Sequence, residues 1–383
     1  MNNISEIHIN KKNLINNVLE FRKKILENKK NSQIKIAGVV KANAYGHGTK
    51  EVVSILEKYV DYFQVDDFAE LQEIRQYTQK PTFVFGYVAK NQLSDAIKLN
   101  GIFGVYDLGI IKKINQISKS QNKKTKIHIK IDCFLGRQGI LSSQAREFFI
   151  AIKKFEFLEV EAVYSHFSNI EDVDNLEHAQ KQYHDLLKTK QIAKDCGFYN
   201  IFHHISATSG FLTDQKENWG GEIVRLGIGM YGLWPSVFLK KRFEKYINIK
   251  PVMSWITQIA QIKDLPKNYP IGYGKTFITN KKTKIAIIPQ GYSDGYDRGF
   301  SNNGHVLIAG KKCKILGRVA MNMFVVDISF DISKNILKVG DIVVLLGVQN
   351  NQEITAEFLA ENINTINYEF VTRIWPKLPR KII

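Results

Sequence analysis

Short apolar runs alternate with amphipathic helical stretches from residue 34 to about residue 232, and this alternation restricts the fold more than any other feature of the chain. Eight runs have strand length, carry many branched and aromatic residues and are bounded by turn formers, so they predict strands. They are residues 34–40, 62–65, 82–85, 102–105, 126–132, 159–164, 201–206 and 222–226. Eight strand–helix units in about 200 residues are what a closed parallel barrel requires. An open doubly wound sheet is the alternative, but no Gly-x-Gly-x-x-Gly turn follows the first strand.

The pattern changes after about residue 243, where β-rich segments joined by turns replace the alternation. We therefore predict an α/β protein, with a TIM-type (β/α)8 barrel over residues 1–244 and a mostly-β C-terminal domain over residues 245–383. Residues 1–10, in which Ile7 and Ile9 alternate with polar neighbours, are the candidate for an additional strand of the second domain. In that domain we expect one helix, over residues 356–364, and strands in residues 252–262, 283–289, 305–309, 312–318, 323–328 and 340–346.

The composition argues against several classes of protein. The net charge is +17, but the lysines are spread along the chain and form only short clusters, so we expect no nucleic-acid partner. The first residues lack an apolar stretch of signal-peptide type, and no apolar run approaches the roughly 18 residues of a membrane span, so we expect no secretion and no membrane. Three cysteines far apart suit a reducing cytoplasm and lack zinc-ligand spacing, so we expect a cytoplasmic protein without a metal.

Polar and reactive side chains follow the ends of the predicted barrel strands. In a parallel barrel the chemistry collects at the carboxyl ends of the strands, where this chain has Lys41, Asp132, Tyr164, His166, Ser206, Thr208, Arg225 and Gly227. The fifth strand also has a polar face, which consists of Lys126, His128, Lys130 and Asp132 in alternation with three isoleucines. We expect the isoleucines to pack under the helices and the polar face to line the interior of the barrel.

Lys41 ends the first predicted strand and is followed by small residues and a phenol. A lysine at the end of a buried strand is desolvated, and desolvation frees the amine for Schiff-base chemistry. The alternative is an ordinary lysine whose ammonium reaches the surface. The whole string is more specific than the single residue, because VVKANAYGHG, residues 39–48, resembles the pyridoxal-phosphate lysine segment of the alanine racemases, a family of fold-type III pyridoxal-phosphate enzymes.

This resemblance extends over essentially the whole chain and implies two catalytic bases. Lys41 matches the cofactor lysine, and GYGKTF, residues 272–277, resembles the family's tyrosine motif, which implies Tyr273 as the base on the opposite face of the substrate. A phenol of ordinary pKa, about 10, is a poor base unless positive charge lies nearby, and His166 and Arg225 match the family's supporting pair. In the family the tyrosine acts in the partner subunit, which implies a head-to-tail homodimer with a shared active site. Without the resemblance, a tyrosine between glycines is an ordinary turn residue.

Arg225 also matches the position that faces the pyridine nitrogen of the cofactor. A guanidinium stays protonated, so it would donate a hydrogen bond to that nitrogen without giving up a proton. The ring would then stay a weak electron sink, which limits side reactions such as transamination. The alternative is an arginine at the rim of the barrel that pairs with a carboxylate such as Glu222.

Further residues match positions that contact the cofactor phosphate. Backbone amides after the last strand of a barrel are the expected anion cradle. The family usually has Asn-Ser-Ala after the histidine of the seventh strand, whereas this chain has HISATSG, residues 204–210, so Ser206 and Ser209 are alternatives to Thr208. Besides Lys41, His166 and Arg225, the implied cofactor-binding residues are Tyr45, Thr208, Gly227, Ile228 and Tyr368.

Three more motifs imply the substrate site. KIDCFLGR, residues 130–137, has the family's spacing and implies that Arg137 binds substrate and is oriented by a carbamylated Lys130, although Cys-Phe-Leu replaces the usual Thr-Gly-Met. GYSDG, residues 291–295, implies Tyr292 at the substrate entrance. GRVAMN, residues 317–322, implies that the backbone amide of Met321 meets the substrate carboxylate, with Asn322 in place of the family's aspartate.

The resemblance thus implies a cytoplasmic pyridoxal-phosphate enzyme that interconverts L-alanine and D-alanine and supplies D-alanine for peptidoglycan. Lys41 would exchange the proton of D-alanine, and Tyr273 that of L-alanine. The nearest alternative is a racemase of broader specificity, for serine or lysine. More distant alternatives are a decarboxylase of the same two-domain plan, a non-catalytic pyridoxal-phosphate carrier and a basic nucleic-acid-binding protein. The tyrosine motif argues against the decarboxylase, and the β-rich second half argues against the carrier.

Overall fold

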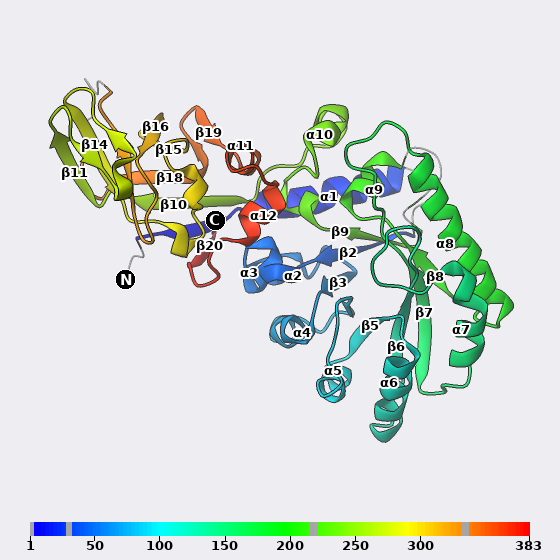
Figure 1. Cartoon of the computed structure of the whole chain (residues 1–383). Helices are drawn as coiled ribbons and strands as arrows, with labels where there is room; N and C mark the ends of the chain where they lie inside the picture. The colour runs from blue at the N-terminus through cyan, green and yellow to red at the C-terminus, as the bar shows by residue number, and fades with distance from the viewer. Residues whose placement is uncertain (1–3, 28–32, 215–218, 220, 331–336) are drawn as a thin grey trace. The chain divides into compact units, whose positions relative to one another are not determined.

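The computed structural model describes residues 4–27, 33–214, 219, 221–330 and 337–383 (Figure 1). The chain divides into two compact units. One, here called the barrel unit, comprises residues 13–44 and 52–250. The other, here called the β unit, comprises residues 1–12, 45–51 and 251–383, so a short segment just after Lys41 belongs with the C-terminal part of the chain.

The barrel unit is built on eight parallel strands in the order β8-β7-β6-β5-β4-β3-β2-β9. Backbone hydrogen bonds from Glu222 to His203 and from Arg225 to Ser206 join the two ends of this order, so the sheet closes on itself. The predicted (β/α)8 barrel is confirmed, and every strand overlaps its predicted range. The strands are β2 (Lys35–Val39), β3 (Tyr62–Val65), β4 (Thr82–Val84), β5 (Gly101–Val105), β6 (Thr125–Lys130), β7 (Leu158–Tyr164), β8 (Phe202–His204) and β9 (Ile223–Leu226).

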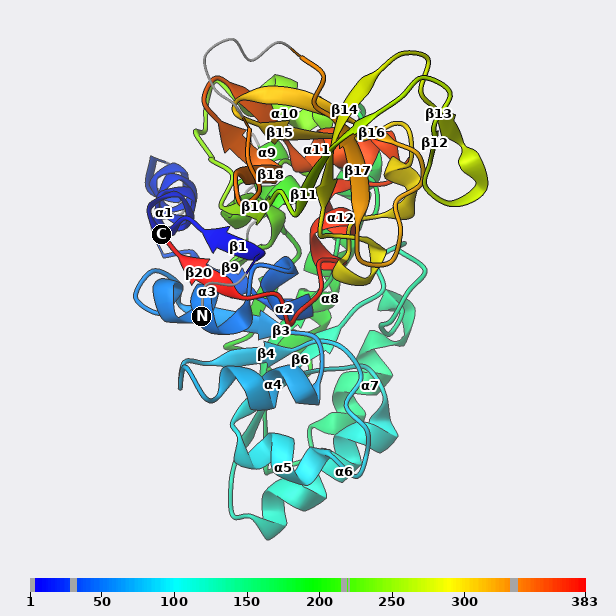
Figure 2. The same ribbon diagram turned by 90° about the vertical axis from the view of Figure 1, so that its left-hand side faces the viewer.

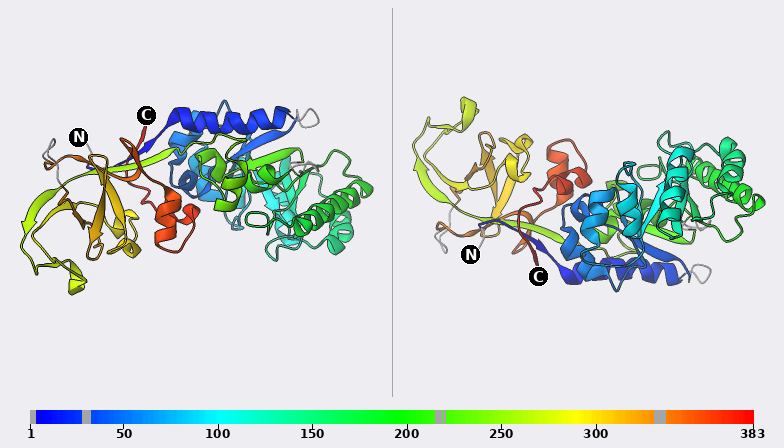
Figure 3. Two further views of the ribbon diagram at one scale, coloured as in Figure 1. Left: turned by 90° about the horizontal axis from the view of Figure 1, so that it is seen from above. Right: turned by 90° about the horizontal axis from the view of Figure 1, so that it is seen from below.

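Helices lie around the outside of these strands (Figure 2), and α1 runs along one edge of the barrel unit (Figure 3). The amphipathic helix α6, for example, buries Ile111 and Ile114 and is N-capped by the carboxylate of Asp107. None of the described helices is both long and apolar enough to cross a membrane. The helices up to residue 250 are α1 (Lys11–Glu27), α2 (Lys41–Tyr45), α3 (Thr49–Leu56), α4 (Phe68–Ile74), α5 (Leu93–Lys98), α6 (Leu108–Ser120), α7 (Ala145–Ile152), α8 (Glu177–Asp195), α9 (Thr208–Thr213) and α10 (Val237–Phe243).

Side chains fill the interior of the barrel. His128 is fully buried there, with its ring centroid 4.8 Å from that of Phe83, and Lys130 on the same strand is also buried. The isoleucines that alternate with them are buried as well. The predicted inward polar face of the fifth strand is therefore confirmed for these two residues, whereas the Lys126 side chain is 44% exposed.

The β unit contains a ten-stranded sheet in the order β11-β14-β17-β16-β15-β18-β10-β1-β20, with β19 paired to β18. The amino-terminal strand β1 (Glu6–Ile9) pairs with β10 and with the carboxyl-terminal strand β20 (Arg380–Ile382). A separate two-stranded hairpin consists of β12 (Pro270–Ile271) and β13 (Phe277–Ile278). The other strands are β10 (Met253–Gln258), β11 (Gln261–Leu265), β14 (Thr283–Ile288), β15 (His305–Ile308), β16 (Lys311–Leu316), β17 (Phe324–Asp327), β18 (Ile342–Gln349) and β19 (Gln352–Ile354).

Two predictions for the C-terminal part are wrong. The expected single strand over residues 252–262 is two strands, because the backbone changes partner at Ile259 and Ala260, which bond to Asp341 and Ile287 respectively. The expected single helix is also incomplete, since α12 (Asn367–Thr372) follows α11 (Ala356–Asn362). Six residues without a side-chain N-cap are too few to show a helical period in the sequence.

Candidate active site

A left-handed turn follows β2 and carries Lys41 at its start. Residues 42–45 all have φ between 51° and 54°, a conformation that costs a non-glycine residue about 1–2 kcal/mol. The Glu70 carboxylate accepts hydrogen bonds from the amide of Ala42 (2.6 Å) and from the amide of Asp66 (2.7 Å). One side chain of α4 therefore holds together the turns that follow β2 and β3.

The Lys41 side chain reaches the rim of the barrel. It is 42% exposed, and its Nζ lies 3.8 Å from the Asp66 carboxylate. The expected desolvation of Lys41 is therefore wrong for this structure, because burial ends with Val40 and the turn directs the next side chain outward. Sequence reasoning gave no role to Asp66, whose position depends on contacts between turns that are distant in the chain.

Arg225 is the most enclosed charge of the site, at 4% exposure. Its guanidinium donates to the carbonyl oxygens of Ser165 (2.8 Å) and Ile205 (3.0 Å), to Nδ1 of His166 (3.2 Å) and to Nδ1 of His204. Burial lowers the pKa of Arg225 to about 10, so the guanidinium stays charged at neutral pH. The β9 strand thus delivers a fixed cation into the barrel.

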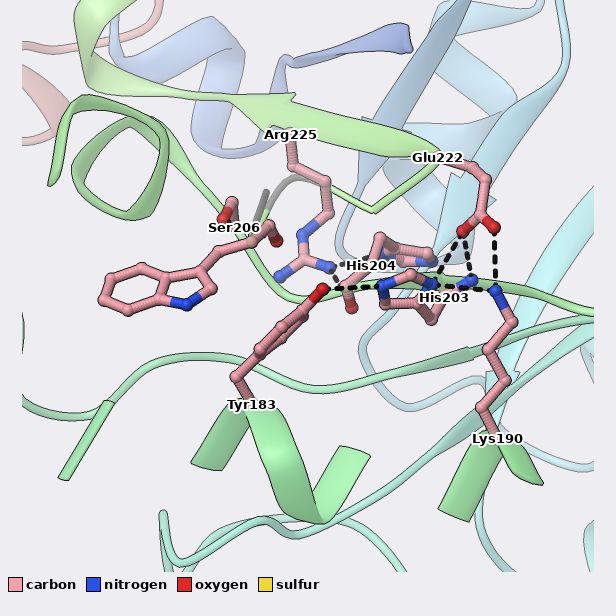
Figure 4. Close-up of polar contacts among 8 residues, drawn as sticks. Tyr183, Lys190, His203, His204, Ser206, Glu222 and Arg225 are labelled. Atoms are coloured by element: carbon pink, nitrogen blue, oxygen red, sulfur yellow. Dashed lines mark hydrogen bonds and ion pairs between the residues drawn. The ribbon is translucent and has the colours of Figure 1, made fainter. Parts of the chain in front are cut away.

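Glu222, the alternative partner of Arg225, pairs with other residues. Glu222 bonds to Lys190 of α8 (2.7 Å) and to His203 of β8 (2.8 Å), and Figure 4 shows this cluster apart from the Arg225 guanidinium. Burial alone would raise the pKa of Glu222, but the bonds from His203 and Lys190 hold it at about 2. Arg225 is therefore not a rim arginine neutralised by Glu222.

A chain of hydrogen bonds leads from Arg225 through the barrel to a carboxylate. His204 Nε2 lies 2.9 Å from His128 Nδ1, and His128 Nε2 lies 2.9 Å from Glu161. Because a guanidinium only donates, His204 accepts at Nδ1 and donates from Nε2, and His128 in turn donates to Glu161. Burial lowers the pKa of both histidines, so two neutral rings connect a cation with an anion.

Glu161 was missed by sequence reasoning. Opposite Ile127 and His128 of β6, strand β7 contributes Val160 and Ala162, so Glu161 is the extra residue of a β-bulge. The bulge turns its carboxylate towards His128 and Lys126, the latter at 2.6 Å. Burial alone would raise the pKa of Glu161, but these two partners hold it at about 2.

Lys130 is a buried amine without a hydrogen-bond partner among the described residues. It is 3% exposed, and its Nζ lies 5.1 Å from the ring centroid of Tyr164. Burial, followed by the charges of Arg225 and Arg137, lowers the pKa of Lys130 to about 7. A large fraction of this amine is therefore neutral at physiological pH.

Arg137 and His166 line a cavity of about 340 Å³ at the end of the barrel, together with Ser209. Desolvation, then the charge of Arg225, lowers the pKa of His166 well below its ordinary value. Since the neutral ring accepts from Arg225 at Nδ1, His166 carries its proton on Nε2. The cavity is thus lined by an exposed cation and a neutral imidazole, and also by the acidic residues Glu171 and Asp172.

The hydroxyl of Thr208 differs from those of Ser206 and Ser209 in its hydrogen bonds. The Ser206 hydroxyl donates to the carbonyl of Trp219 (2.9 Å), and the Ser209 hydroxyl donates to Glu171 (2.6 Å). The Thr208 oxygen accepts from the amide of Gly229 (3.3 Å), and no acceptor for its hydrogen occurs among the described residues. Thr208 thus lies beside the 3-10 turn Ile228–Tyr231, which follows Gly227 and has no side-chain N-cap.

The β unit brings together two other predicted phosphate ligands. The rings of Tyr45 and Tyr368 have centroids 6.2 Å apart. Gly46 allows this approach, because a Cβ atom there would overlap the carbonyl group of Val371. The segment after Lys41 is therefore tied to α12, an element that the sequence did not predict.

Tyr273 occupies an exposed turn of the β unit. It begins the 3-10 turn Tyr273–Lys275 between β12 and β13 and is 73% exposed. Gly272 and Gly274, with φ of 72° and 74°, pack against Arg318, where a Cβ on Gly274 would lie 3.0 Å from the guanidinium. Backbone geometry thus fixes the turn that carries the phenol within this unit.

Tyr292 and Met321 also lie close together in the β unit. The amide of Tyr292 bonds to the carbonyl of Ala320 (3.2 Å), and the amide of Ser293 bonds to that of Met321 (3.1 Å). The side chain of Asn322 donates to the Ser293 hydroxyl (2.9 Å). Asparagine at this position therefore has a structural partner that needs no charge.

The predicted site residues fall into two groups, one in each unit. Within each unit the structure brings predicted residues into contact: Arg225 with His166, Tyr45 with Tyr368. The group in the β unit consists of Tyr45, Tyr273, Tyr292, Met321 and Tyr368, and that in the barrel unit of Lys41, Lys130, Arg137, His166, Thr208, Arg225, Gly227 and Ile228.

Comparison with known proteins assigns both units. Residues 9–235 match the family model "Alanine racemase, N-terminal domain", and residues 252–382 match "Alanine racemase, C-terminal domain". The chain is 34% identical to alanine racemase 2 of Caldanaerobacter subterraneus subsp. tengcongensis over 98% of this chain and 94% of that protein. It is 35% identical to alanine racemase 1 of the same organism over 91% of this chain and 88% of that protein. Its structure resembles that of the alanine racemase of Clostridium difficile 630, at 33% identity, with a TM-score of 0.91 over 100% of this chain and 96% of that one. The chain belongs to the alanine racemase family.

Proposed function

We propose that this protein interconverts L-alanine and D-alanine with pyridoxal phosphate as cofactor. Family membership over both units supports the reaction. The observation that carries the proposal is the pairing, at the end of one barrel, of an accessible Lys41 with a buried guanidinium at Arg225. A lysine amine can hold the aldehyde carbon of the cofactor, and a group that only donates suits its pyridine nitrogen.

The residues of the barrel unit fit the cofactor. Arg225 is held rigidly by its own hydrogen bonds, so an N–H group can face the ring without reorganisation. Thr208 keeps a hydroxyl hydrogen for a phosphate oxygen beside the amides of Gly227 and Ile228. When bound, the cofactor withdraws electrons from the substrate and acidifies its Cα–H bond.

Two bases on opposite faces would then exchange the Cα proton. In the proposal Lys41 takes the proton of D-alanine and Tyr273 takes that of L-alanine. Tyr273 is exposed on a turn whose backbone is fixed by its own unit. A residue that acts in another subunit needs this exposure. We propose that it acts in the active site of a partner in a head-to-tail homodimer, supported there by His166 and Arg225.

We further propose that Lys130 is carbamylated. Its neutral amine would attack carbon dioxide and lose one proton, and the resulting anion would lie among the charges of Arg137 and Arg225 that now depress the pKa of Lys130. Native mass spectrometry in bicarbonate buffer should show the added mass of one carbon dioxide, which Lys130→Met should lack. An unmodified mass under these conditions would refute the modification.

Tyr292 and Met321 are the proposed entrance residues. Both side chains are exposed and bulky, and backbone bonds join their two segments, which supports a small amino acid such as alanine as the substrate. Three buried, unpaired cysteines agree with a reducing cytoplasm, where D-alanine would enter peptidoglycan synthesis. A racemase for serine or lysine remains the alternative.

One assay tests the proposal. The purified protein, loaded with pyridoxal phosphate, is incubated separately with L-alanine, L-serine and L-lysine, and the D-isomer is measured in each. D-alanine formed with the highest kcat/KM supports the proposal. Faster racemisation of serine or lysine would establish the alternative, and no D-isomer from any of the three would reject racemase activity.

A further inference from the structure

The loop that carries Arg137 is closed at both ends. It follows β6, and the amide of Asp132 bonds to the carbonyl of Ile140 (2.9 Å) while the amide of Ile140 bonds to the carbonyl of Lys130 (3.0 Å). Gly139 makes this closure feasible, since a Cβ atom there would overlap the backbone of Asp132. Residues 132–139 therefore form a compact loop at the carboxyl end of a barrel strand.

The Asp132 carboxylate lies at the centre of this loop. One of its oxygens accepts from the amides of Leu135 (2.9 Å) and Gly136 (3.0 Å), and the other accepts from the amide of Arg137 (3.2 Å). Three consecutive backbone donors thus converge on one anion. Hydrogen bonds to an ionised acceptor are stronger than those between neutral groups.

The loop is strained, so something must hold it. Phe134 has φ of 58°, in the left-handed region that favours glycine. Such conformations persist only where the surrounding structure determines them. The Phe134 ring is 48% exposed and lies under the ammonium of Lys181, 4.2 Å away, which is too weak a contact at the surface to fix the backbone. Gln182 holds the carbonyl of Cys133 just before the strained residue (2.6 Å), and the three bonds to Asp132 are the contacts that span it.

Arg137 depends on this backbone for its position. Among the described residues its exposed guanidinium makes no hydrogen bond or ion pair, although it lines the 340 Å³ cavity together with His166. An arginine without side-chain partners can be presented in one place only if its Cα is fixed.

We infer that Asp132 is the positioning residue that presents Arg137 to the carboxylate of the amino-acid substrate. Asp132 does not touch the substrate itself; it organises the loop before substrate arrives. This inference rests on the proposed function for the identity of the substrate. By helping to order the loop in advance, this carboxylate lowers the entropy cost that would otherwise be met at each binding event.

The holoenzyme variants Asp132→Asn and Asp132→Ala test this role. An asparagine can keep the two bonds to its oxygen but places an N–H group against the Arg137 amide, whereas alanine loses all three. We expect KM for L-alanine to rise about tenfold in Asp132→Asn and more in Asp132→Ala, with kcat within about threefold, because carboxylate binding is common to ground and transition states. The inhibition constant of propionate, a carboxylate without an amine, should rise in parallel.

Asp107→Asn is the matched control. Asp107 follows β5 as Asp132 follows β6, and its carboxylate accepts from the amide of Ile110 (2.8 Å) to cap α6. Its loop carries no predicted site residue. Asparagine is as good an N-cap as aspartate, so the control should keep Tm, KM and the propionate constant close to wild-type values.

Hydrogen exchange separates this inference from the proposed function. In both Asp132 variants residues 133–139 should lose protection from exchange, even if the protein racemises no alanine. Wild-type exchange in this segment, or a KM within twofold of wild type, would overturn the inference. So would equal falls of kcat and kcat/KM at unchanged KM, since a positioning role in binding predicts the opposite split. If wild-type protein forms no D-alanine, the proposed function fails, and hydrogen exchange of residues 133–139 still decides the role of Asp132.

Discussion

The barrel unit and the β unit fix their candidate site residues in different ways. In the barrel unit Arg225 is 4% exposed, and a chain of hydrogen bonds through His204 and His128 connects its guanidinium with the carboxylate of Glu161. In the β unit Tyr273 is 73% exposed and depends on the backbone of two flanking glycines. The site residues of the barrel unit are held by a buried network of charged and polar groups, whereas Tyr273 of the β unit is carried by a turn of defined backbone geometry.

The two groups of site residues are therefore sensitive to different substitutions. A buried network fails when one charge is removed, because the remaining charges lose their compensation. An exposed turn tolerates the loss of a hydroxyl group, so a change there should alter chemistry while leaving the fold intact. Substitutions that keep side-chain shape can therefore distinguish the two halves.

The largest effect is expected at Lys41. Lys41→Ala should lose both the visible absorbance of bound pyridoxal phosphate and all detectable racemisation, because no other amine lies at this strand end. Absorbance and D-alanine formation are measured on the same preparation. Lys35→Ala, at the opposite end of the same strand, is the control and should keep both. Retention of the cofactor spectrum by Lys41→Ala would contradict the assignment.

Tyr273→Phe should separate chemistry from cofactor binding. We expect a normal cofactor spectrum and an unchanged Tm, with kcat lower by about 10²- to 10⁴-fold, the usual contribution of one general base. Steady-state kinetics in both directions is the measurement. Tyr269→Phe, an exposed tyrosine beside the same hairpin, should racemise normally. Wild-type turnover in Tyr273→Phe would show that the second base lies elsewhere.

Glu161→Gln should act on stability. The pKa of Glu161 is lowered from 4.5 to about 2, so this carboxylate stabilises the fold fully above pH 4.5 and loses that contribution as pH falls towards 2. We expect the variant to be about 2 kcal/mol less stable at pH 7, with the difference from wild type shrinking below pH 4.5. Urea unfolding at several pH values measures it. Glu159→Gln, on the exposed side of the same strand, should change stability little; equal effects of the two variants would show that the bulge has no special role.

The same residue shows where prediction from sequence stops. Alternation along β6 correctly placed His128 and Lys130 inside the barrel, because side chains of a regular strand point to opposite faces in turn. On β7 the bulge breaks that alternation, so no periodic pattern could place Glu161 inside. Regular strands are local and predictable, whereas a bulge depends on pairing with another strand.

The left-handed turn after β2 and the helix α12 could not be predicted from the sequence either. Four successive non-glycine residues in a left-handed turn have no sequence signal, and Glu70, which holds that turn, is about thirty positions away. The helix α12 is too short to show a period, yet it brings Tyr368 to Tyr45. The rule that chemistry collects where barrel strands end sufficed to place Lys41, Arg225 and His166 at the rim, whereas their roles were implied by the resemblance.

The smallest effect is expected at Thr208, and it resolves the choice among three hydroxyls. Thr208→Val keeps the shape but removes the hydroxyl hydrogen left for the phosphate, so we expect the Kd for pyridoxal phosphate to rise by about threefold to tenfold, the value of one hydrogen bond. Thr208→Ser should restore binding. Ser206→Ala and Ser209→Ala should leave this Kd unchanged, because their hydroxyls already donate to Trp219 and Glu171. Equilibrium titration of the apoenzyme measures all four, and a weaker affinity in Ser209→Ala than in Thr208→Val would transfer the phosphate contact to Ser209.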